Sequence, residues 1–535
     1  MAERMSTNSQ TEGLVVERRV SNDRHARTRI RWSVATAFLL VAAVLSAAFA
    51  AGNRSALVHP VNAADQKSAG PGDSFRLGSQ RGHTSYKVKQ LKAISGPSPF
   101  VAGCPGGLFD STNITGHELE PAIAVNPANP RNIVATWKQD VGPDSTRSDL
   151  VAFSLNNGRT WHRRTLPGLT TCTGGTADTG SDPWVSAGGD GTVYFSGLAA
   201  DQSTDPPMTA VVAGHSKDGG RTWPALSTVA APLAGNETDA ITGSPTRPRH
   251  AYMTWANFEI NPPRVNTVEF SRTTNNGATW SRPVLVDQPG EFQLDLAPKI
   301  HVLPNGTLVC VFARADLETG LGTLQAARSV DGGRTWLPAV EAGSKPVVTS
   351  TDPETGEQLP SPGYPSSAVA PDGTLYIAFE DSRSPSSGAI GVARSRDGGQ
   401  TWMQMNLPGV SSYAFEPAIA VNRHGTVGVI WYDLRNDVPG DGSLSADVWF
   451  AHSANRGRTW TQTHVAGPTD LRTAPLPGHN YVGEYQGLAA LGDGDFAASF
   501  TLASPYAKNG PTDIFFARIG PRNERQHSTC HGCKH

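Results

Sequence analysis

The sequence predicts an all-β propeller of seven four-stranded antiparallel blades, with a six-bladed ring as the alternative. Three observations support this prediction. One eight-residue motif occurs six times at a spacing of about 60 residues, short β-rich runs separate the copies, and 56 Gly and 40 Pro punctuate the 535 residues. Repetition of this kind is typical of stacked copies of one supersecondary unit, and frequent turn residues indicate hairpins rather than long helices.

The repeated motif is predicted to form a tight turn between two strands. Its third residue is Asp or Asn, whose side chain accepts hydrogen bonds from backbone N–H groups just downstream. A Gly two positions later supplies a positive φ, and the final Trp packs beside the next strand. The copies end at Trp161, Trp223, Trp280, Trp336, Trp402 and Trp460.

This motif resembles the Asp-box (BNR) repeat of the sialidase-like β-propeller superfamily, whose pattern is Ser/Thr-x-Asp-x-Gly-x-Thr-Trp. The resemblance covers about residues 100–520 and implies that the boxes are structural turns at the periphery of the blades. The chain departs from the family in two ways. The family's arginine-bearing Phe/Tyr-Arg-Ile-Pro motif is absent before the first box, and the sialidases have six blades whereas this chain has seven blade openings.

Each box is preceded by strands that together make a four-stranded unit. The seven innermost strands are predicted to open at Glu120-Pro121, Asp182-Pro183, Asp239-Ala240, Leu296-Ala297, Tyr364-Pro365, Glu416-Pro417 and Glu484-Tyr485. The seventh unit stops one strand short. We expect the segment around Tyr86–Leu91 to supply the missing outer strand beside Asp513–Arg518, because closing the ring removes exposed sheet edges.

The propeller is predicted to occupy residues 85–520, after an N-terminal targeting segment. Residues 1–31 form a basic leader that should stay cytoplasmic, and residues 32–52 form an uncharged stretch of membrane-spanning length. This stretch is either a transmembrane anchor or the core of a cleaved signal peptide, and the long charged leader favours the anchor. Residues 53–84 are predicted to be a flexible linker. The propeller is therefore expected outside the cytoplasm, membrane-anchored or secreted.

The cysteines support an oxidising compartment. Cys104 and Cys172 precede the first strands of successive repeats, which places them on the same face and makes a disulfide between them possible. Cys310 lies in an alternating strand and is predicted to be a buried, inert thiol. The tail, residues 521–535, carries Cys530 and Cys533 among histidines. A tail disulfide or an adventitious metal site is favoured over a dedicated zinc site, because the second half of a zinc motif is missing.

Charge and motifs exclude several classes of function. A formal net charge of −2 offers no electrostatic footprint for nucleic acid, and no phosphate loop or dinucleotide fingerprint is present. No cofactor is predicted. Asp437, Asp441 and Asp447 offer hard oxygens for Ca²⁺, but their spacing fits no EF-hand loop and a solvated acidic loop is favoured. The expected partners are an extracellular glycan or protein, together with the membrane through the N-terminal helix.

The functional face is predicted to be the one opposite the boxes. In an antiparallel blade, the start of strand one and the end of strand two share an edge, and the turn between strands three and four lies at the other edge. The catalytic candidates on this face are Tyr432, Glu416, Asp381 and Asp433. The substrate-binding candidates are Arg314, Arg383, Arg435, Glu120, Asp182 and Glu484. Companion residues are His117, Glu118, Asp239, Asp316, Trp431, His479, Asn480, Tyr481 and Tyr485.

Two chemical interpretations of this face stay open. Arginines bind a carboxylate of a substrate in bidentate fashion, and a carboxylic acid can protonate a leaving oxygen. The resemblance to sialidases implies a Tyr nucleophile, which makes Tyr432 with Glu416 the first pair to consider. In the structural interpretation, which is favoured, the Asp-x-Arg pairs are salt bridges to neighbouring blades and the acid-Pro pairs bind loop N–H groups.

Two functions follow from these interpretations. One is an exported sialidase-like propeller with exo-sialidase-type glycoside hydrolase activity. The other is a non-catalytic propeller at the cell surface that binds a protein or a carbohydrate. A deep pocket with an acid and a nucleophile would favour the hydrolase, and a shallow rim would favour the binding protein.

Overall fold

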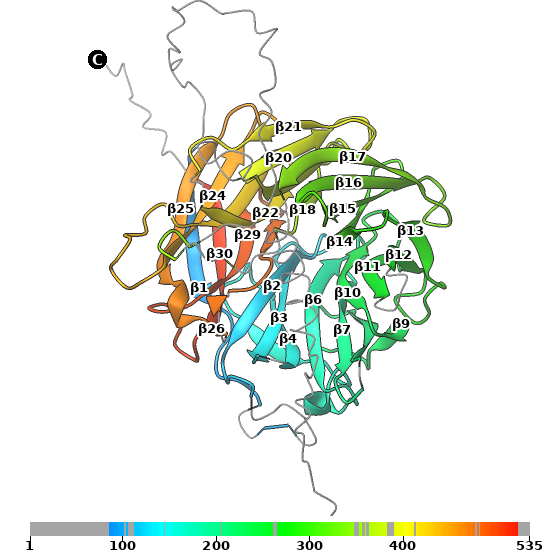
Figure 1. Cartoon of the computed structure of the whole chain (residues 1–535), viewed down its shortest axis with the longest axis horizontal. Helices are drawn as coiled ribbons and strands as arrows, with labels where there is room; N and C mark the ends of the chain where they lie inside the picture. Colours follow the sequence, from blue (N-terminus) through cyan, green and yellow to red (C-terminus); the bar gives the residue numbers. More distant parts are fainter. Residues whose placement is uncertain are drawn as a thin grey trace, which may run out of the picture. The chain divides into compact units, whose positions relative to one another are not determined.

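The chain forms a closed ring of seven antiparallel sheets of four strands each (Figure 1). The computed structural model describes residues 85–522, except for residues 101–102, 105–111, 144, 205, 260–264, 347–351, 356–358, 360–362, 382–389, 411–412, 477–478 and 481. Each innermost strand contacts the innermost strands of both neighbouring sheets. The prediction of seven four-stranded blades is confirmed, and the six-bladed alternative is wrong.

The first four blades follow the chain in order. Blade 1 contains β2 (Glu118–Val125), β3 (Ile133–Val141), β4 (Thr146–Ser154) and β5 (His162–Thr165). After the short 3-10 helix η1 (Thr171–Thr173), blade 2 contains β6 (Thr179–Ala187), β7 (Val193–Asp201), β8 (Met208–Ser216) and β9 (Ser227–Leu233). Blade 3 contains β10 (Asn236–Gly243), β11 (Ala251–Glu259), β12 (Val265–Thr273) and β13 (Val284–Asp287). Blade 4 contains β14 (Gln293–Val302), β15 (Leu308–Asp316), β16 (Leu321–Ser329) and β17 (Leu337–Pro346).

The last three blades bring the chain back to its start. Blade 5 contains β18 (Ser366–Val369), β19 (Leu375–Glu380), β20 (Ile390–Ser395) and β21 (Met403–Asn406). Blade 6 contains β22 (Ala414–Val421), β23 (Val427–Asp433), β24 (Ser445–Ser453) and β25 (Thr461–Asp470). The connection to blade 7 holds the 3-10 helix η2 (Leu471–Thr473) and a small hairpin of β26 (Pro475–Leu476) and β27 (His479–Asn480). Blade 7 contains β28 (Gly487–Ala490), β29 (Phe496–Leu502), β30 (Asp513–Pro521) and β1 (Tyr86–Ala93).

The two ends of the described chain close the ring together, as predicted. Strand β1 pairs with β30, with Gln90 opposite Arg518 and Leu91 opposite Ala517. The Tyr86 ring is 7% exposed and lies within 6.2 Å of the rings of Phe450 and Phe496. In Figure 1 the blue strand β1 lies beside the red strand β30. The last blade is therefore completed by the first strand of the sequence.

The six boxes form hydrogen-bonded turns between strands three and four. In blade 4, the Ser329 hydroxyl accepts a hydrogen bond from Gly333 N–H at 2.8 Å and donates one to Asp331 Oδ1 at 2.8 Å. The Asp331 carboxylate also accepts from the N–H of Thr335 at 3.0 Å and from its hydroxyl at 2.7 Å. The neighbouring Trp336 packs edge-on against Phe270 of blade 3 at 5.3 Å. This turn thus satisfies the polar groups of Ser329 and Asp331 within the box, and its Trp336 joins adjacent blades.

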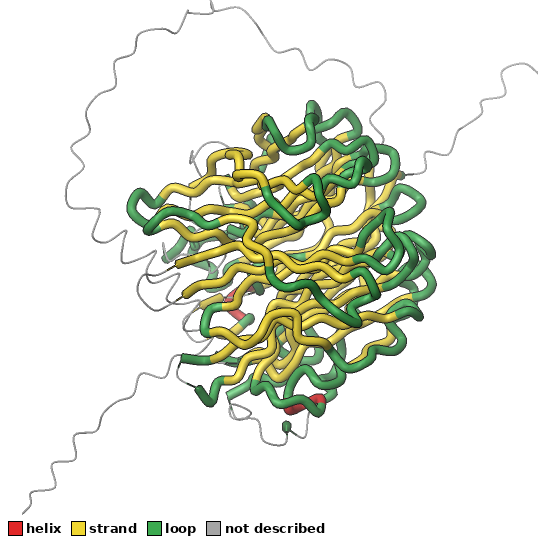
Figure 2. The backbone as a smooth tube through the Cα atoms, turned by 90° about the vertical axis from the view of Figure 1, so that its right-hand side faces the viewer, coloured by secondary structure: helices red, strands yellow, loops and turns green. Residues whose placement is uncertain are grey.

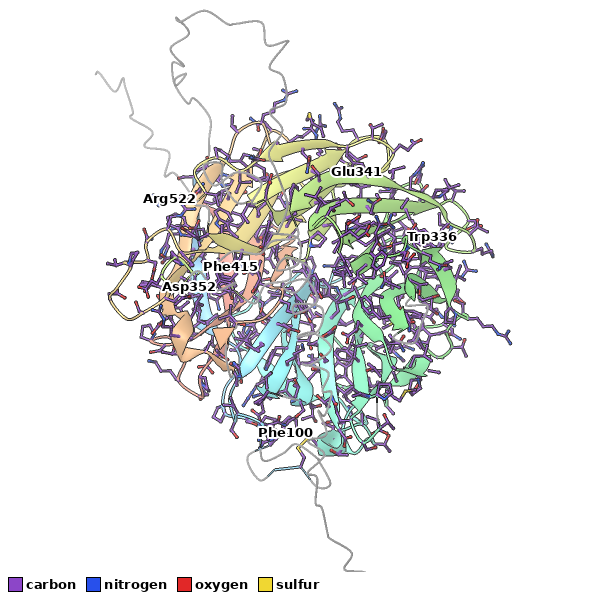
Figure 3. All side chains as sticks on the ribbon, viewed as in Figure 1. Phe100, Trp336, Glu341, Asp352, Phe415 and Arg522 are labelled. Atoms are coloured by element: carbon purple, nitrogen blue, oxygen red, sulfur yellow. A yellow bond between two sulfur atoms is a disulfide. The ribbon has the colours of Figure 1, made fainter. Side chains whose placement is uncertain are left out.

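The two faces of the ring carry different connections. In blade 6, Phe415 at the start of strand one lies opposite Tyr432 near the end of strand two, whereas the box begins at Ser453, opposite Val427 at the other end. Figure 2 shows the strands running between two layers of loops. Figure 3 shows Trp336 at the periphery and Phe415 nearer the axis. The boxes therefore lie on the face opposite the strand-one openings, as expected.

The cysteines behave as predicted where the structure describes them. Cys104 and Cys172 form a disulfide across 68 residues, with Cα atoms 4.6 Å apart, and it lies near Phe100 in Figure 3. Cys310 is a buried free thiol, and burial raises its pKa well above the usual value. The predicted anchor, linker and Cys530/Cys533 tail lie outside the described residues. Within the part of the chain that the structure describes, no helix has the length and apolar character needed to span a membrane.

Candidate functional site at the propeller axis

A repeated irregularity of strand one shapes the centre of the ring. In five blades, the first strand loses register with the second at a β-bulge, and a residue other than Gly takes a positive φ there. These residues are Glu120 (56°), Asp182 (53°), Thr238 (46°), Ala297 (51°) and Glu416 (49°). Bulges re-aim side chains, and left-handed conformations outside Gly cost free energy that persists mostly at functional sites. The fold therefore repeats one strained turn around the axis.

A pocket opens at the axis among these bulges. Its walls come from the first strands of blades 2 to 4 and from the segments that enter blades 5 to 7. The side chains that give it its chemical character are Asp182, Trp184, Asp239, Lys299, Tyr364 and Glu484. With Tyr485, three carboxyl groups, one amine and three aromatic rings therefore share one cavity, and carboxyl groups outnumber the basic group.

An aromatic wall is built across the axis. The Lys299 ammonium lies 3.6 Å from the centre of the Trp184 ring, and Tyr485 meets the same ring edge-on at 5.5 Å. The Tyr485 hydroxyl donates to the Pro183 carbonyl at 3.2 Å, so the segment before β28 reaches blade 2. Burial lowers the pKa of Lys299 to about 7. The protonated amine thus makes a cation–π interaction with Trp184, and it titrates near neutral pH.

Asp182 is surrounded by donors. The Lys138 ammonium lies 2.6 Å from Glu120 Oε2 and 3.3 Å from Asp182 Oδ1. The Ser181 hydroxyl donates to Asp182 Oδ1 at 2.7 Å, and the Thr238 N–H donates to Oδ2 at 3.0 Å. Burial alone would lower the pKa of Lys138, but the carboxylates of Glu120 and Asp182 raise it above its usual value. Lys138 therefore bridges blades 1 and 2 beneath the pocket.

Asp239 has the opposite environment. Its side chain lines the pocket, is 5% exposed, and neither carboxyl oxygen has a hydrogen-bond partner among the described residues. Burial raises the pKa of Asp239 well above its usual value; the nearby Ser196 hydroxyl opposes this effect, and the carboxylates of Asp182 and Asp149 add to it. Burial likewise raises the pKa of Asp149 and of Glu237. One pocket thus holds a carboxyl group with several close donors and a second, buried one with far weaker hydrogen bonding.

The predicted pair Tyr432 and Glu416 does not meet in this pocket. Tyr432 is 1% exposed and stacks on Phe415 with ring centres 5.2 Å apart. Its hydroxyl donates to the Thr501 carbonyl at 2.8 Å and accepts from the Thr501 N–H at 2.9 Å. Burial raises its pKa well above the usual value. The hydroxyl therefore joins blades 6 and 7, a placement that does not suit a nucleophile.

Glu416 and two other acidic candidates, Asp381 and Asp433, are buried outside the axial pocket. The Glu416 N–H donates to Glu380 Oε1 at 2.9 Å, and burial together with the Glu380 carboxylate raises the pKa of Glu416. Asp381 is 1% exposed. Asp433 is fully buried and accepts from the Trp431 indole at 3.1 Å. None of these three acids lines the axial pocket, whereas the predicted Asp182 and Glu484 do.

The described arginine candidates are held by acids away from the pocket. Arg314 Nε donates to Asp295 Oδ1 at 2.7 Å, and the same guanidinium bridges to Asp287 of blade 3. This second contact is a salt bridge between blades, as the structural interpretation expects. Arg435 Nε donates to Asp433 within its own turn at 2.8 Å. Arg383 lies outside the described residues.

The remaining candidates divide between separate places. His117 and Glu118 are buried, and Glu118 N–H donates to the Thr512 hydroxyl at 2.7 Å in blade 7. The Asp316 carboxylate accepts a hydrogen bond from the Thr319 N–H at 2.9 Å, within the loop that follows β15. His479 and Asn480 form β27, and Tyr481 lies outside the described residues. Within the described ranges, no group of three or more His, Cys, Asp or Glu side chains is arranged to hold a metal ion, the Asp437, Asp441 and Asp447 loop included.

Trp184, Lys138 and Lys299 were not predicted from the sequence. Trp184 and Lys299 each stand two positions after a bulge residue, Asp182 and Ala297. An alignment of the seven openings at that position would have found both residues. The bulge also corrects two predicted openings, because the strained residue is Thr238 rather than Asp239 and Ala297 rather than Leu296. Lys138 lies in strand two, where its sequence carries no local signal.

Comparisons with known proteins give structural similarity only. No family model matches the chain, and no curated protein sequence matches it. A protein of unknown function from Dyadobacter fermentans is similar over 82% of this chain and 99% of its own, with 13% identity and a TM-score of 0.46. The Hadza microbial sialidase Hz136 covers 72% of this chain and 75% of its own, with 16% identity and a TM-score of 0.42. An α-L-arabinanase from Penicillium chrysogenum covers 82% and 98%, with 15% identity and a TM-score of 0.42. Similarities at this level assign no function to the chain.

Proposed function

We propose that the protein is directed at glycans and that its axial pocket hydrolyses a glycosidic bond of a neutral sugar. The observation that carries this proposal is the contrast between Asp239 and Asp182 in one pocket. Two carboxyl groups whose environments differ in this way supply the acid and the carboxylate that glycoside hydrolysis needs. Trp184 and Tyr364 also line the pocket, and aromatic side chains of this kind can pack against the apolar face of a sugar.

Each carboxyl group then has a distinct role. Asp239, kept protonated by burial, donates its proton to the oxygen of the leaving group as the glycosidic C–O bond breaks. Asp182, held by Lys138 and Thr238, either attacks the anomeric carbon or removes a proton from an attacking water. Lys138 is a positioning residue, because it contacts Asp182 and Glu120 and does not line the pocket.

The charge of the pocket favours a neutral sugar over a sialic acid. A sialoside carboxylate would face the carboxylates of Asp182 and Glu484, and neither Arg314 nor Arg435 lines the pocket. Lys299 is the one basic side chain among the residues described as lining it, and burial lowers its pKa to about 7, so that it carries only part of a positive charge near neutral pH. The repulsion expected between like charges argues against the exo-sialidase hypothesis.

A screen of chromogenic glycosides tests this function. Purified protein is expected to release the chromophore from at least one neutral glycoside and from no sialoside. Turnover of a sialoside would contradict the neutral-sugar specificity. Binding of a neutral sugar without turnover of any glycoside would instead support the non-catalytic alternative, which uses the same pocket.

We also propose an extracytoplasmic location, membrane-anchored or secreted. The Cys104–Cys172 disulfide supports this proposal, because structural disulfides persist in oxidising compartments. Treatment of intact cells with a protease that cannot cross the cytoplasmic membrane tests this location, because an extracytoplasmic propeller should be digested. Protection of the propeller from the protease after the outer envelope has been permeabilised would contradict it.

A further inference from the structure

A second groove lies on the same face as the axial pocket, in blade 6. It forms between the loop that joins β23 to β24 and the end of β25, and its polar walls come from Asn436, Asp441, Asp447 and His464. Asp433 pairs with Asp447, and Ala414 at the start of strand one pairs with Asp433. The groove is therefore at the end of the blade that carries the strand-one opening. We call it the blade-6 groove.

A buried carboxylate is built into this groove. The Asp447 side chain is 2% exposed and accepts hydrogen bonds from His464 Nε2 at 2.7 Å and Asn436 Nδ2 at 2.8 Å. Gly467 lies against it with a φ of 115°, and a Cβ at that position would be 2.6 Å from Asp447 Oδ1. Only Gly fits this backbone without displacing the carboxylate. The arrangement of Asp447, Gly467 and His464 is therefore fixed by packing.

A rigid aromatic ring forms another wall. The Arg435 guanidinium lies 4.2 Å from the centre of the Trp449 ring, and His464 meets that ring edge-on at 5.2 Å. Arg435 is itself held by Asp433 and by Gln462, whose Oε1 is 2.9 Å from Arg435 Nη1. Because its neighbours are already ordered, Trp449 would lose little freedom on contact with a ligand.

We propose that the blade-6 groove is a second sugar-binding site, which holds a more distant residue of the same glycan. This inference rests on the proposed function of the axial pocket. A fixed indole ring beside a carboxylate, an imidazole and an amide suits a polyhydroxylated ligand that presents both C–H and O–H groups. His464, 44% exposed, and the exposed Asp441 remain accessible to hydroxyl groups.

Other ligand classes fit the blade-6 groove less well. The carboxylates of Asp441 and Asp447 disfavour an anion. Ca²⁺ would need several free oxygens at once, but the two oxygens of Asp447 bind His464 and Asn436, and Asp441 Oδ1 accepts from the Ser443 N–H and hydroxyl. A neutral oligosaccharide is the class that uses the aromatic and the polar walls together.

Binding of neutral monosaccharides and oligosaccharides, with calcium chloride as a separate probe, tests the inference. We would introduce His464→Ala and Asp441→Asn separately into Asp239→Asn protein, so that hydrolysis does not disturb the measurement. Asp201→Asn in blade 2 is the matched control, because Asp201 also accepts from the N–H and hydroxyl of a serine two positions later, Ser203, and does not line the groove. Thermal melting checks that each variant folds.

Both groove variants are expected to weaken oligosaccharide binding about tenfold and to leave monosaccharide binding unchanged, since one hydrogen bond to a charged group is removed or reduced. Asp201→Asn should change neither. Unchanged oligosaccharide binding in folded His464→Ala and Asp441→Asn proteins would overturn the inference, as would failure of the parent protein to bind any oligosaccharide. A rise in melting temperature with Ca²⁺ that Asp441→Asn removes would also overturn it, in favour of a cation site. If the groove variants lose affinity while no glycoside is ever hydrolysed, the proposed hydrolysis fails and the blade-6 groove stands.

Discussion

The periphery and the axis of this propeller use the same acidic side chains for opposite purposes. At the periphery, the Asp397 carboxylate of a box accepts hydrogen bonds from Thr401 N–H at 2.9 Å and Gln400 N–H at 3.0 Å. Its slight burial would raise its pKa, but hydrogen bonds from Thr401 lower the pKa to about 2. At the axis, Asp239 is 5% exposed, and burial raises its pKa. The difference shows that burial and local donors, and not residue type, separate a structural acid from a candidate catalytic one.

The largest loss of stability is expected when the strand that closes the ring is removed. Replacing residues 85–93 with a Gly/Ser linker of equal length should unfold the ring or lower its melting temperature strongly. Loss of the buried Tyr86 ring alone is expected to cost about 3 kcal/mol or more, and the edge of β30 would lose its partner. Differential scanning calorimetry checks this prediction. A melting temperature equal to that of the intact chain would show that closure adds no stability.

The next largest loss of stability is expected from substitution of Gly333, a box glycine at the periphery. In Gly333→Ala, the new Cβ would lie 2.2 Å from Phe270 Cε1 at a φ of 83°, so the fully buried ring must move. We expect a loss of about 3 kcal/mol or more in the free energy of unfolding. Gly425→Ala is the matched control, because its φ is 77° and no atom lies within 4 Å of the added Cβ. Its expected cost is about 1–2 kcal/mol from backbone conformation alone.

Equal losses in Gly333→Ala and Gly425→Ala, measured by urea denaturation, would contradict the role assigned to the box. In that case backbone strain, and not the contact between the box of blade 4 and Phe270 of blade 3, would limit stability. The pair therefore separates the two physical contributions of a box glycine.

The disulfide is expected to have a comparable but smaller effect. Replacing Cys104 and Cys172 together with Ser removes a cross-link over 68 residues. The free energy of unfolding should fall by about 2–4 kcal/mol, chiefly because the unfolded chain gains freedom. Chemical denaturation with and without a reducing agent checks this value. The wild-type protein should become as weak as the double variant when reduced, and an unchanged midpoint would contradict a structural disulfide.

The smallest predicted effect is a pH dependence of opposite sign at the two regions. The folded pKa of Asp397 is about 2, below the value of about 3.9 for an unfolded Asp. Its contribution is therefore present above pH ~4 and lost as the pH falls toward 2; solvent screening limits it to about 1 kcal/mol. The folded pKa of Asp239 is raised, so its contribution is fully present below pH ~4 and lost as the pH rises through that raised value.

Stability curves of two variants over pH check these signs. Asp397→Asn should flatten the loss of stability on the acidic side, and Asp239→Asn should flatten the loss on the side of rising pH. A matching change in both variants on the same side would contradict the contrast between the two regions.

The periphery could be predicted from the sequence because its chemistry is local. In a box, Ser329, Asp331 and Gly333 satisfy one another within five residues, so their spacing is enough to identify the turn. The closing strand was also predictable, because the last blade lacked a partner for β30. Local hydrogen bonding and the number of strands in each blade thus determined the architecture.

The axis was only partly predictable because its chemistry is long-range. Asp182 and Glu484 were predicted on the face of the strand-one openings, and both line the pocket. The position of Tyr432 could not be predicted, because its hydroxyl forms hydrogen bonds with Thr501, which lies 69 residues further along the chain. The β-bulges shift two of the predicted openings by one residue, and Lys138 reaches Asp182 from another blade. No spacing along the chain encodes these contacts.

The rate of glycoside hydrolysis in Asp239→Asn and Asp397→Asn proteins tests the central claim most directly. Both variants remove one carboxyl group while keeping its shape, and Asn already occupies the box position in blade 1 as Asn156. The account predicts that Asp239→Asn lowers kcat on a neutral glycoside by about 10²–10⁴-fold, the usual contribution of a general acid, with folding intact. Asp397→Asn should leave kcat unchanged. Equal activity in the two folded variants would contradict the assignment of catalysis to the axial pocket.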